Sequence, residues 1–262
     1  MTEFRHLDID VADGIATVTM NRPEVLNGLD PAAHAEMERV WGEIGEDDDV
    51  RVAILTGAGR AFSAGGDLKS MQERLAVDPG AGAGITAASA RRVIYNLLDF
   101  EKPLIAAVNG HAVGLGATLA LLCDMVVVSD QAVLGDPHIS IGLVPGDGGL
   151  AAWTVLAGPN RAKEFMMLGT MASAEDAERL GLVNRVVAPD EVLGTARELA
   201  ERLVTGPQVA LRGTKISVNN WIKAQFASLF EVSLAAELQS MAHPDFAEGV
   251  AAAIEKRPPV FE

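Results

Sequence analysis

The sequence predicts an α/β body over residues 1–190, followed by an all-helical C-terminal domain over residues 191–262. In the first part, short apolar runs typical of buried strands alternate with glycine-rich loops and helical runs. From residue 189 onward, apolar residues recur at steps of three and four, the period of a helix with one buried face. A chain of 262 residues is long enough to bury a full core.

Composition and charge exclude several classes of protein. The chain is 49% hydrophobic and 22% charged, and its net charge of −15 argues against nucleic acid or an anionic membrane surface as partner. Residues 1–10 lack the apolar core of a signal peptide, and the apolar run over residues 112–123 is too short to span a bilayer. The single cysteine, Cys123, excludes an internal disulfide and a cysteine metal cluster. We therefore expect a cytoplasmic protein.

Local patterns predict the elements in order. Residues 4–11 and 15–20 alternate apolar and polar side chains around Asp13-Gly14, which indicates a β-hairpin. Asp30 followed by Pro31 is typical of a helix start, because aspartate caps free N–H groups and proline fits the first turn. After the hairpin, helices are predicted over residues 30–45, from residue 68, over residues 87–98 and in a run that ends at residue 123, and short helices follow up to residue 180. Strands are predicted over residues 52–56, 104–108, 125–128, 132–134 and near 183–187. The predicted C-terminal helices cover residues 192–203, 208–221, 226–241 and 244–256.

Two glycine-rich loops carry the candidate chemistry, because each follows a predicted strand. Residues 57–67 follow the strand over 52–56, and residues 110–118 follow the strand over 104–108. Glycines let a ligand approach the backbone, and the free N–H groups at a helix start favour negative charge. Two such loops on adjacent strands can direct two N–H groups at one point, as in an oxyanion hole. The alternative is that the glycines serve close packing only.

Other interpretations of the glycines are weaker. Gly114-Leu115-Gly116 lacks the third glycine of a dinucleotide-binding G-x-G-x-x-G motif, and no P-loop motif is present. Residues 78–84 read DPGAGAG, the most flexible-looking stretch of the chain. We expect a mobile lid or a plain surface loop there.

Motifs spread in order over nearly the whole chain carry a specific resemblance. They are Asn21-Arg22-Pro23 with Leu26-Asn27, AFSAGGDLKSM at 61–71, KPLIAAVNGHAVGLG at 102–116, LCD at 122–124, GLVPGDGG at 142–149, AERLGLV at 177–183 and Glu255-Lys256-Arg257. With these motifs the chain resembles the crotonase superfamily, the enoyl-CoA hydratase/isomerase family.

The resemblance implies a crotonase-type spiral of ββα units with a C-terminal trimerisation domain, and hence a homotrimer or a dimer of trimers. It implies an acyl-CoA substrate whose thioester carbonyl is held by the backbone N–H groups of Gly66 and Leu115. No metal or redox cofactor is implied, because coenzyme A enters as part of the substrate. By position, the substrate-binding residues would be Val25, Leu26, Ala64, Gly65, Asp67, Leu68, Lys69 and Gly114.

Some of these positions allow a plain structural role. Lys69 could meet a CoA phosphate or be a solvated helix lysine, and Asp67 precedes a helix that it is expected to cap. The resemblance lets Lys256 or Arg257 reach coenzyme A on a neighbouring subunit. His111, just before the second glycine loop, is expected to be a wall residue rather than a base.

Two positions depart from the family pattern. Hydratases of the family carry two glutamates that handle the water and its proton. Their places here hold Thr118, three residues after the second oxyanion donor, and His138, which follows Pro137. A threonine hydroxyl is a poor base at neutral pH, so a standard two-glutamate hydration is in doubt.

His138 with Asp147 could replace the glutamates. Histidine titrates near neutrality, and an aspartate can orient it and stabilise its charged form. Asp147 lies nine residues later, in a Pro-Gly-Asp-Gly-Gly sequence that also suits a plain turn. A His/Asp pair at this spacing also resembles the crotonase-fold β-diketone hydrolases, which cleave C–C bonds by a retro-Claisen reaction.

The sequence thus leads to one preferred function and two alternatives. The preferred function is an enoyl-CoA hydratase/isomerase that stabilises a thioester enolate, with Thr118 and His138 in place of the glutamates. The first alternative is a β-diketone hydrolase that uses His138 and Asp147. The second is a non-catalytic CoA-binding protein.

Overall fold

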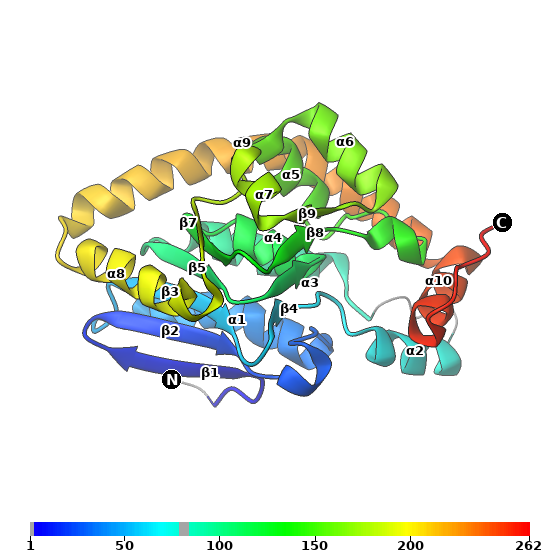
Figure 1. Cartoon of the computed structure of the whole chain (residues 1–262), viewed down its shortest axis with the longest axis horizontal. Coiled ribbons are helices and arrows are strands. Elements are labelled where there is room, and N and C mark those ends of the chain that lie inside the picture. Colours follow the sequence, from blue (N-terminus) through cyan, green and yellow to red (C-terminus); the bar gives the residue numbers. More distant parts are fainter. Residues whose placement is uncertain (1–2, 79–83) are drawn as a thin grey trace.

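The computed structural model describes residues 3–78 and 84–262, and its body is built on two β-sheets covered by helices (Figure 1). Residues 79–83, part of the predicted lid or surface loop, lie outside the described residues. The predicted α/β class is confirmed, since strands and helices alternate up to residue 187 and only helical elements follow in the described chain. Among the described residues, no helix is both long and apolar enough to cross a membrane.

The larger sheet has the strand order β1-β2-β3-β5-β7-β10. Its first two strands form the predicted antiparallel hairpin, in which Asp13 and Gly14 adopt the φ angles of 55° and 79° that a tight turn requires. The remaining neighbours pair in parallel, so these strands end at the same edge of the sheet. The strands are β1 Leu7–Ala12, β2 Ile15–Met20, β3 Val52–Gly57, β5 Leu104–Val108, β7 Met125–Ser129 and β10 Arg185–Val187.

The smaller sheet has the strand order β4-β6-β8-β9, and most of it was not predicted. Its strands are β4 Ala61–Ser63, β6 His111–Val113, β8 Val133–Gly135 and β9 Met171–Ser173. Each has three residues, too few to show the alternation of a strand, and β4 and β6 lie within the two stretches predicted as glycine-rich loops. The parallel pairing of β4 with β6 brings those two loops together.

The helices match the predicted positions with one correction. The helices predicted over 208–221 and 226–241 are a single helix, α9, Gln208–Met241. Residues 222–225 contain no glycine or proline, so the backbone continues in a helix although the apolar pattern breaks there. The other helices are α1 Pro31–Glu46, α2 Leu68–Val77, α3 Ala87–Asp99, α4 Leu115–Leu121, α5 Gly149–Ala157, α6 Pro159–Leu168, α7 Ala174–Arg179, α8 Val192–Val204 and α10 Pro244–Glu255, and the 3-10 turns are Pro23–Val25, His138–Ile141 and Pro189–Glu191.

The C-terminal helices pack on the body. α8 buries Val192 and Ala196 against one face of the larger sheet, where they meet Ile54. α9 runs along the length of the molecule and buries Phe230 and Leu234 in the main core, while α10 lies beside α2 (Figure 1). The C-terminal helices therefore cover two parts of the body: α8 covers the larger sheet, and α9 covers the main core.

Buried Asn27 ties the loop before α1 to β4. Its Nδ2 donates to the carbonyl oxygens of Ala58 at 2.9 Å and Ala61 at 2.8 Å, and its Oδ1 accepts from the backbone N–H of Arg22 at 2.9 Å. The Ser63 hydroxyl donates to the Asn27 carbonyl at 2.8 Å. Asn27 also has a φ of 56°, which asparagine tolerates better than most residues.

We predict that Asn27→Ala destabilises the protein by about 2–4 kcal/mol, because it leaves buried backbone groups without partners and places alanine at positive φ. Urea unfolding followed by circular dichroism measures this change. The control is Asn21→Ala in the same loop, where an exposed Nδ2 donates to Asp8 at 2.6 Å. Equal losses in the two variants would contradict this account of Asn27.

Candidate active site

The two predicted oxyanion donors lie on loops in close contact. A Cβ atom on Gly65 would lie 2.5 Å from the Val113 carbonyl oxygen and 3.3 Å from the Leu115 nitrogen. Since side chains do not tolerate such distances, the contact requires glycine, and Gly65 also has a φ of +77°. The first glycine loop therefore packs directly against the backbone that leads into α4.

Among the described residues, the backbone N–H groups of Gly66 and Leu115 donate to no backbone carbonyl outside their own helices and strands. Gly66 forms an isolated parallel bridge with Leu29, in which Leu29 N–H donates to the Gly65 carbonyl and the Leu29 carbonyl accepts from Asp67 N–H. The N–H of Gly66 itself takes no part in this bridge. Leu115 is the first residue of α4, so its N–H has no partner within the helix. Both residues line the same cavity.

Two cavities meet at this point. The inner one has a volume of about 30 Å³ and is walled by the loops, α3 and α9, and the outer one has a volume of about 230 Å³. Gly66, Met71 and His138 line both. The Met71 methyl group packs against Gly66, where a Cβ atom would stand. The inner cavity holds little more than a water, so an acyl group must displace side chains, which the flexible methionine permits.

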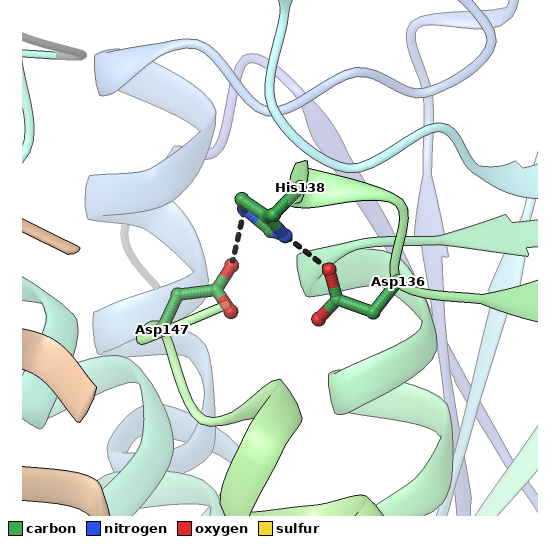
Figure 2. Close-up of side chains that lie close together, drawn as sticks. All are labelled: Asp136, His138 and Asp147. Carbon is green, nitrogen blue, oxygen red and sulfur yellow. Dashed lines mark hydrogen bonds and ion pairs between the residues drawn. The ribbon is translucent and has the colours of Figure 1, made fainter. Parts of the chain in front are cut away.

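A histidine and three carboxylates form a largely buried cluster at the junction, and Figure 2 shows the histidine, His138, between two of them, Asp136 and Asp147. Asp136 follows β8 directly, is fully buried, and accepts a hydrogen bond from Nδ1 of His138. The opposite ring nitrogen, Nε2, lies 3.7 Å from Oδ2 of Asp147 and 3.9 Å from Oε1 of Glu237 on α9. His138, Asp147 and Glu237 line the inner cavity. Asp136 thus fixes the ring, and Nε2 faces the other two carboxylates.

The surroundings shift the acid–base properties of all three cavity-lining groups. Burial by itself lowers the pKa of His138, but Asp136, Asp147 and Glu237 outweigh it and raise the pKa to about 10. Burial raises the pKa of Asp147 to about 6, with His138 opposing and Asp136 adding to the shift. Burial and then the charge of Asp147 raise the pKa of Glu237 well above its ordinary value. The cluster therefore holds protons at neutral pH, and one of its carboxylates, Asp147, titrates near neutral pH.

The structure corrects the expected pairing of His138. The sequence suggested that Asp147 orients the ring, but the orienting hydrogen bond comes from Asp136, two residues before His138. Asp147 instead lies beyond Nε2, at the cavity. Sequence reasoning missed Asp136, although its position two residues from a candidate catalytic histidine is a usable signal. It also missed Glu237, which lies 99 residues beyond His138 on a helix and carries no local signal.

The same cluster has the composition of a metal site. Ligand atoms of Asp136, His138 and Asp147 lie within 4.8 Å of one another. However, the His138–Asp136 hydrogen bond already engages Nδ1 of the ring. A metal ion at Nε2 would have to displace the proton that the raised pKa of the ring keeps there at neutral pH, so the arrangement favours proton transfer.

The other predicted site residues differ in whether they line a cavity. Those lining a cavity, besides His138 and Asp147, are Ala64, Gly66, Leu68, Gly114 and Leu115. Thr118 is fully buried, donates its hydroxyl to the Gly114 carbonyl at 3.3 Å, and lines neither cavity. Its hydroxyl oxygen and Oδ2 of Asp136 both lie against Gly149, so Thr118 borders the cluster around His138, and a catalytic role for it stays a prediction.

Five further predicted residues line neither cavity: Val25, Leu26, Gly65, Asp67 and Lys69. The expected cap is confirmed, since Oδ1 of Asp67 accepts from the backbone N–H groups of Lys69 and Ser70, each at 3.1 Å. The Leu26 carbonyl accepts from Ala64 N–H at 2.9 Å, which places its loop next to the outer cavity. Lys69 is exposed, and its contact with substrate stays a prediction.

Comparisons with known proteins agree on one family. Residues 10–262 match the family model described as enoyl-CoA hydratase/isomerase. The chain is 35% identical to a short-chain-enoyl-CoA hydratase of Clostridium acetobutylicum, over 97% of both chains, and 37% identical to a carnitinyl-CoA dehydratase of Shigella flexneri, over 100% of this chain and 99% of the other. A crystal structure of an enoyl-CoA hydratase/isomerase from Mycobacterium paratuberculosis superposes with a TM-score of 0.87 at 36% identity, over 94% of this chain and 97% of that one.

We predict that Asp136→Asn lowers the pKa of His138 from about 10, because it removes the nearest negative charge. A titration of His138 by NMR measures the shift. As a control, Asp245→Asn removes the carboxylate 3.3 Å from exposed His243 and should leave His138 unchanged. An unaltered His138 pKa in Asp136→Asn would contradict the assigned contact.

The raised pKa also predicts a pH dependence of stability. Between the ordinary value of 6.5 and about 10, folded His138 keeps a proton that the unfolded chain releases, so the free energy of unfolding falls as pH rises across this interval. Denaturant unfolding at a series of pH values tests this. Asp136→Asn should flatten the decline, and an equally steep decline in that variant would count against His138 as its source.

Proposed function

Because the chain belongs to the enoyl-CoA hydratase/isomerase family, we propose that it is an enzyme that adds water to, or removes it from, the acyl part of a coenzyme A thioester. One observation carries this proposal: two free backbone donors, Gly66 and Leu115, line the same cavity as a histidine–carboxylate cluster. The names of the two relatives reported above, a hydratase and a dehydratase, support water addition or removal as the reaction type.

In the proposed mechanism, the N–H groups of Gly66 and Leu115 bind the thioester oxygen. Negative charge grows on this oxygen when the α-carbon becomes an enolate, and fixed donors in a site with little water stabilise that charge. The outer cavity would receive the arm of coenzyme A, and the inner cavity would receive the acyl group once Met71 has moved aside. Exposed Lys69 lies on α2 at the outer end, where it could meet a phosphate.

The cluster supplies the acid and the base in place of the usual two glutamates. Asp147, with a pKa of about 6, is mostly ionised at neutral pH and takes a proton from the attacking water. The oxygen of that water bonds to the β-carbon, and Nε2–H of His138 delivers a proton to the α-carbon. Asp136 holds the ring for this step. Burial raises the pKa of Glu237, which favours its protonated form and so limits the negative charge beside Asp147.

We predict that His138→Ala and Asp147→Asn each lower kcat for crotonyl-CoA hydration by about 10²–10⁴-fold, the usual contribution of a general acid or base. Loss of the enoyl absorbance measures the rate. The control is Glu36→Gln, another buried carboxylate, which accepts from the backbone N–H groups of Arg5 and His6, each at 2.8 Å. Full activity in either site variant would remove that residue from the mechanism.

The cluster also favours a second candidate, hydrolysis of a β-diketone. The specific observation is that a water-activating carboxylate, Asp147, and a protonated imidazole lie beside one oxyanion hole. Retro-Claisen cleavage needs the same parts, since water attacks one carbonyl and the departing enolate is then protonated. A cyclic 1,3-diketone tests this candidate beside crotonyl-CoA. Turnover of the diketone alone would favour it, and binding of coenzyme A without turnover of either compound would favour a non-catalytic protein.

We further propose a homotrimer or a dimer of trimers. Large apolar side chains are exposed on α6 and α9, with exposed fractions of 71% for Met167 and 68% for Val232. Such side chains on a water-soluble surface favour association. Light scattering coupled to gel filtration should therefore give a mass of three or six chains of 27.5 kDa. A mass of one chain at micromolar concentration would contradict this proposal.

A further inference from the structure

A second buried histidine lines the inner cavity. His34 lies on α1 with an exposed fraction of 2%. Its Nδ1 lies 3.0 Å from the Ser89 hydroxyl oxygen and 3.4 Å from Oε1 of Glu38. It shares no hydrogen bond or ion pair with the described residues of the cluster around His138. It is therefore a separate polar group in the same chamber, and the mechanism above does not use it.

The partners of His34 fix the position of its proton. Glu38 is acceptor-only, and it receives the hydrogen of the Ser89 hydroxyl and the guanidinium Nε–H of Arg92, the latter at 2.6 Å. The Ser89 oxygen can then only accept from Nδ1 of His34, so Nδ1 carries the ring proton. Because its hydrogen points to Glu38 rather than to the ring, Ser89 is not an activated nucleophile.

The other ring nitrogen of His34 is a bare acceptor. Burial lowers the pKa of His34 more than Glu38 raises it, so the ring is neutral at neutral pH. In a neutral ring with its proton on Nδ1, Nε2 carries a lone pair. Nε2 has no hydrogen-bond partner among the described residues. An acceptor in this position is unsatisfied until a ligand or a water supplies a donor.

The wall around His34 is otherwise largely apolar. The apolar lining of the cavity includes Leu29, Ile85, Ala90, Leu238 and Met241, and its polar lining is Thr86 together with the cluster residues His138, Asp147 and Glu237. An all-alkyl acyl group would fill this space but leave Nε2 without a donor. A cationic group is disfavoured, because Arg92 already pairs with Glu38, protonated His138 already faces Asp147 and Glu237, and burial would strip the cation of its water. A neutral hydroxyl group satisfies both conditions.

We propose that His34 determines substrate specificity by accepting a hydrogen bond from a hydroxyl group on the acyl part of the substrate. The preferred substrates are then enoyl-CoA thioesters that carry a hydroxyl group farther along the acyl chain than the double bond that reacts. This inference rests on the proposed function, because it uses the same cavity for the acyl group. It adds a recognition element that neither the oxyanion hole nor the His138 cluster supplies.

The test compares pairs of 2-enoyl-CoA substrates that end in a hydroxyl or in a methyl group, over a ladder of chain lengths. Wild-type kcat/KM should favour the hydroxyl member at least about tenfold at one length, because a buried acceptor discriminates against a partner that lacks a donor. His34→Leu should remove this preference by slowing the hydroxyl member alone. His34→Gln, whose amide oxygen can accept a hydrogen bond, should retain part of the preference. This variant also keeps the test decisive if His34→Leu fails to fold.

Several outcomes would overturn the inference. Equal turnover of the hydroxyl and methyl substrates by the wild type at every chain length would overturn it. A His34→Leu variant that slows both substrates equally would also overturn it, because that result shows a structural role only. If no thioester is turned over, the proposed function fails, and calorimetric binding of the saturated pair decides the inference separately. A hydroxyl preference in binding that His34→Leu abolishes would support it, and absence of any preference would overturn it.

Discussion

The close contact between the two glycine loops is the constraint on which the rest of the site depends. β4 and β6 pair in parallel for only three residues each, and Gly65 then packs against the Val113 carbonyl with no room for a side chain. This contact places Gly66 and Leu115 on one cavity. Buried Asn27 holds the preceding loop to the same strand, so the backbone donors are fixed before any ligand arrives, which is what transition-state stabilisation requires.

Burial of charge is the second physical theme. Asp136 has no exposed side-chain surface, and its only partner in the cluster is the His138 ring. Oδ2 of Asp136 and Oδ1 of Asp147 have no hydrogen-bond partner among the described residues. Three carboxyl groups around one imidazole cannot all ionise in a site with little water, so one or more must keep a proton. The cluster is therefore a store of protons beside the cavity that Gly66 and Leu115 line.

The long helix α9 brings residues from the C-terminal part of the chain to the candidate active site. Its buried side chains pack in the main core, and its last turns bring Glu237, Leu238 and Met241 to the inner cavity. The lining of this cavity combines the acidic cluster around His138 with apolar side chains and His34. Under the proposed function, the cluster would transfer protons and His34 would recognise the acyl group.

The sequence by itself determined the α/β class, the hairpin, the strands β3, β5 and β7, and both glycine loops, because these depend on local periodicity, turn chemistry and short motifs. It also singled out His138 and Asp147, which lie near each other in the chain. Only the tertiary structure showed the three-residue strands β4, β6 and β9, which are too short to leave a periodic signal. It alone gave Asp136 its role and brought Glu237 and His34 to the cavity. Glu237 and His34 each lie about a hundred positions from His138, and nothing local in a sequence encodes such contacts.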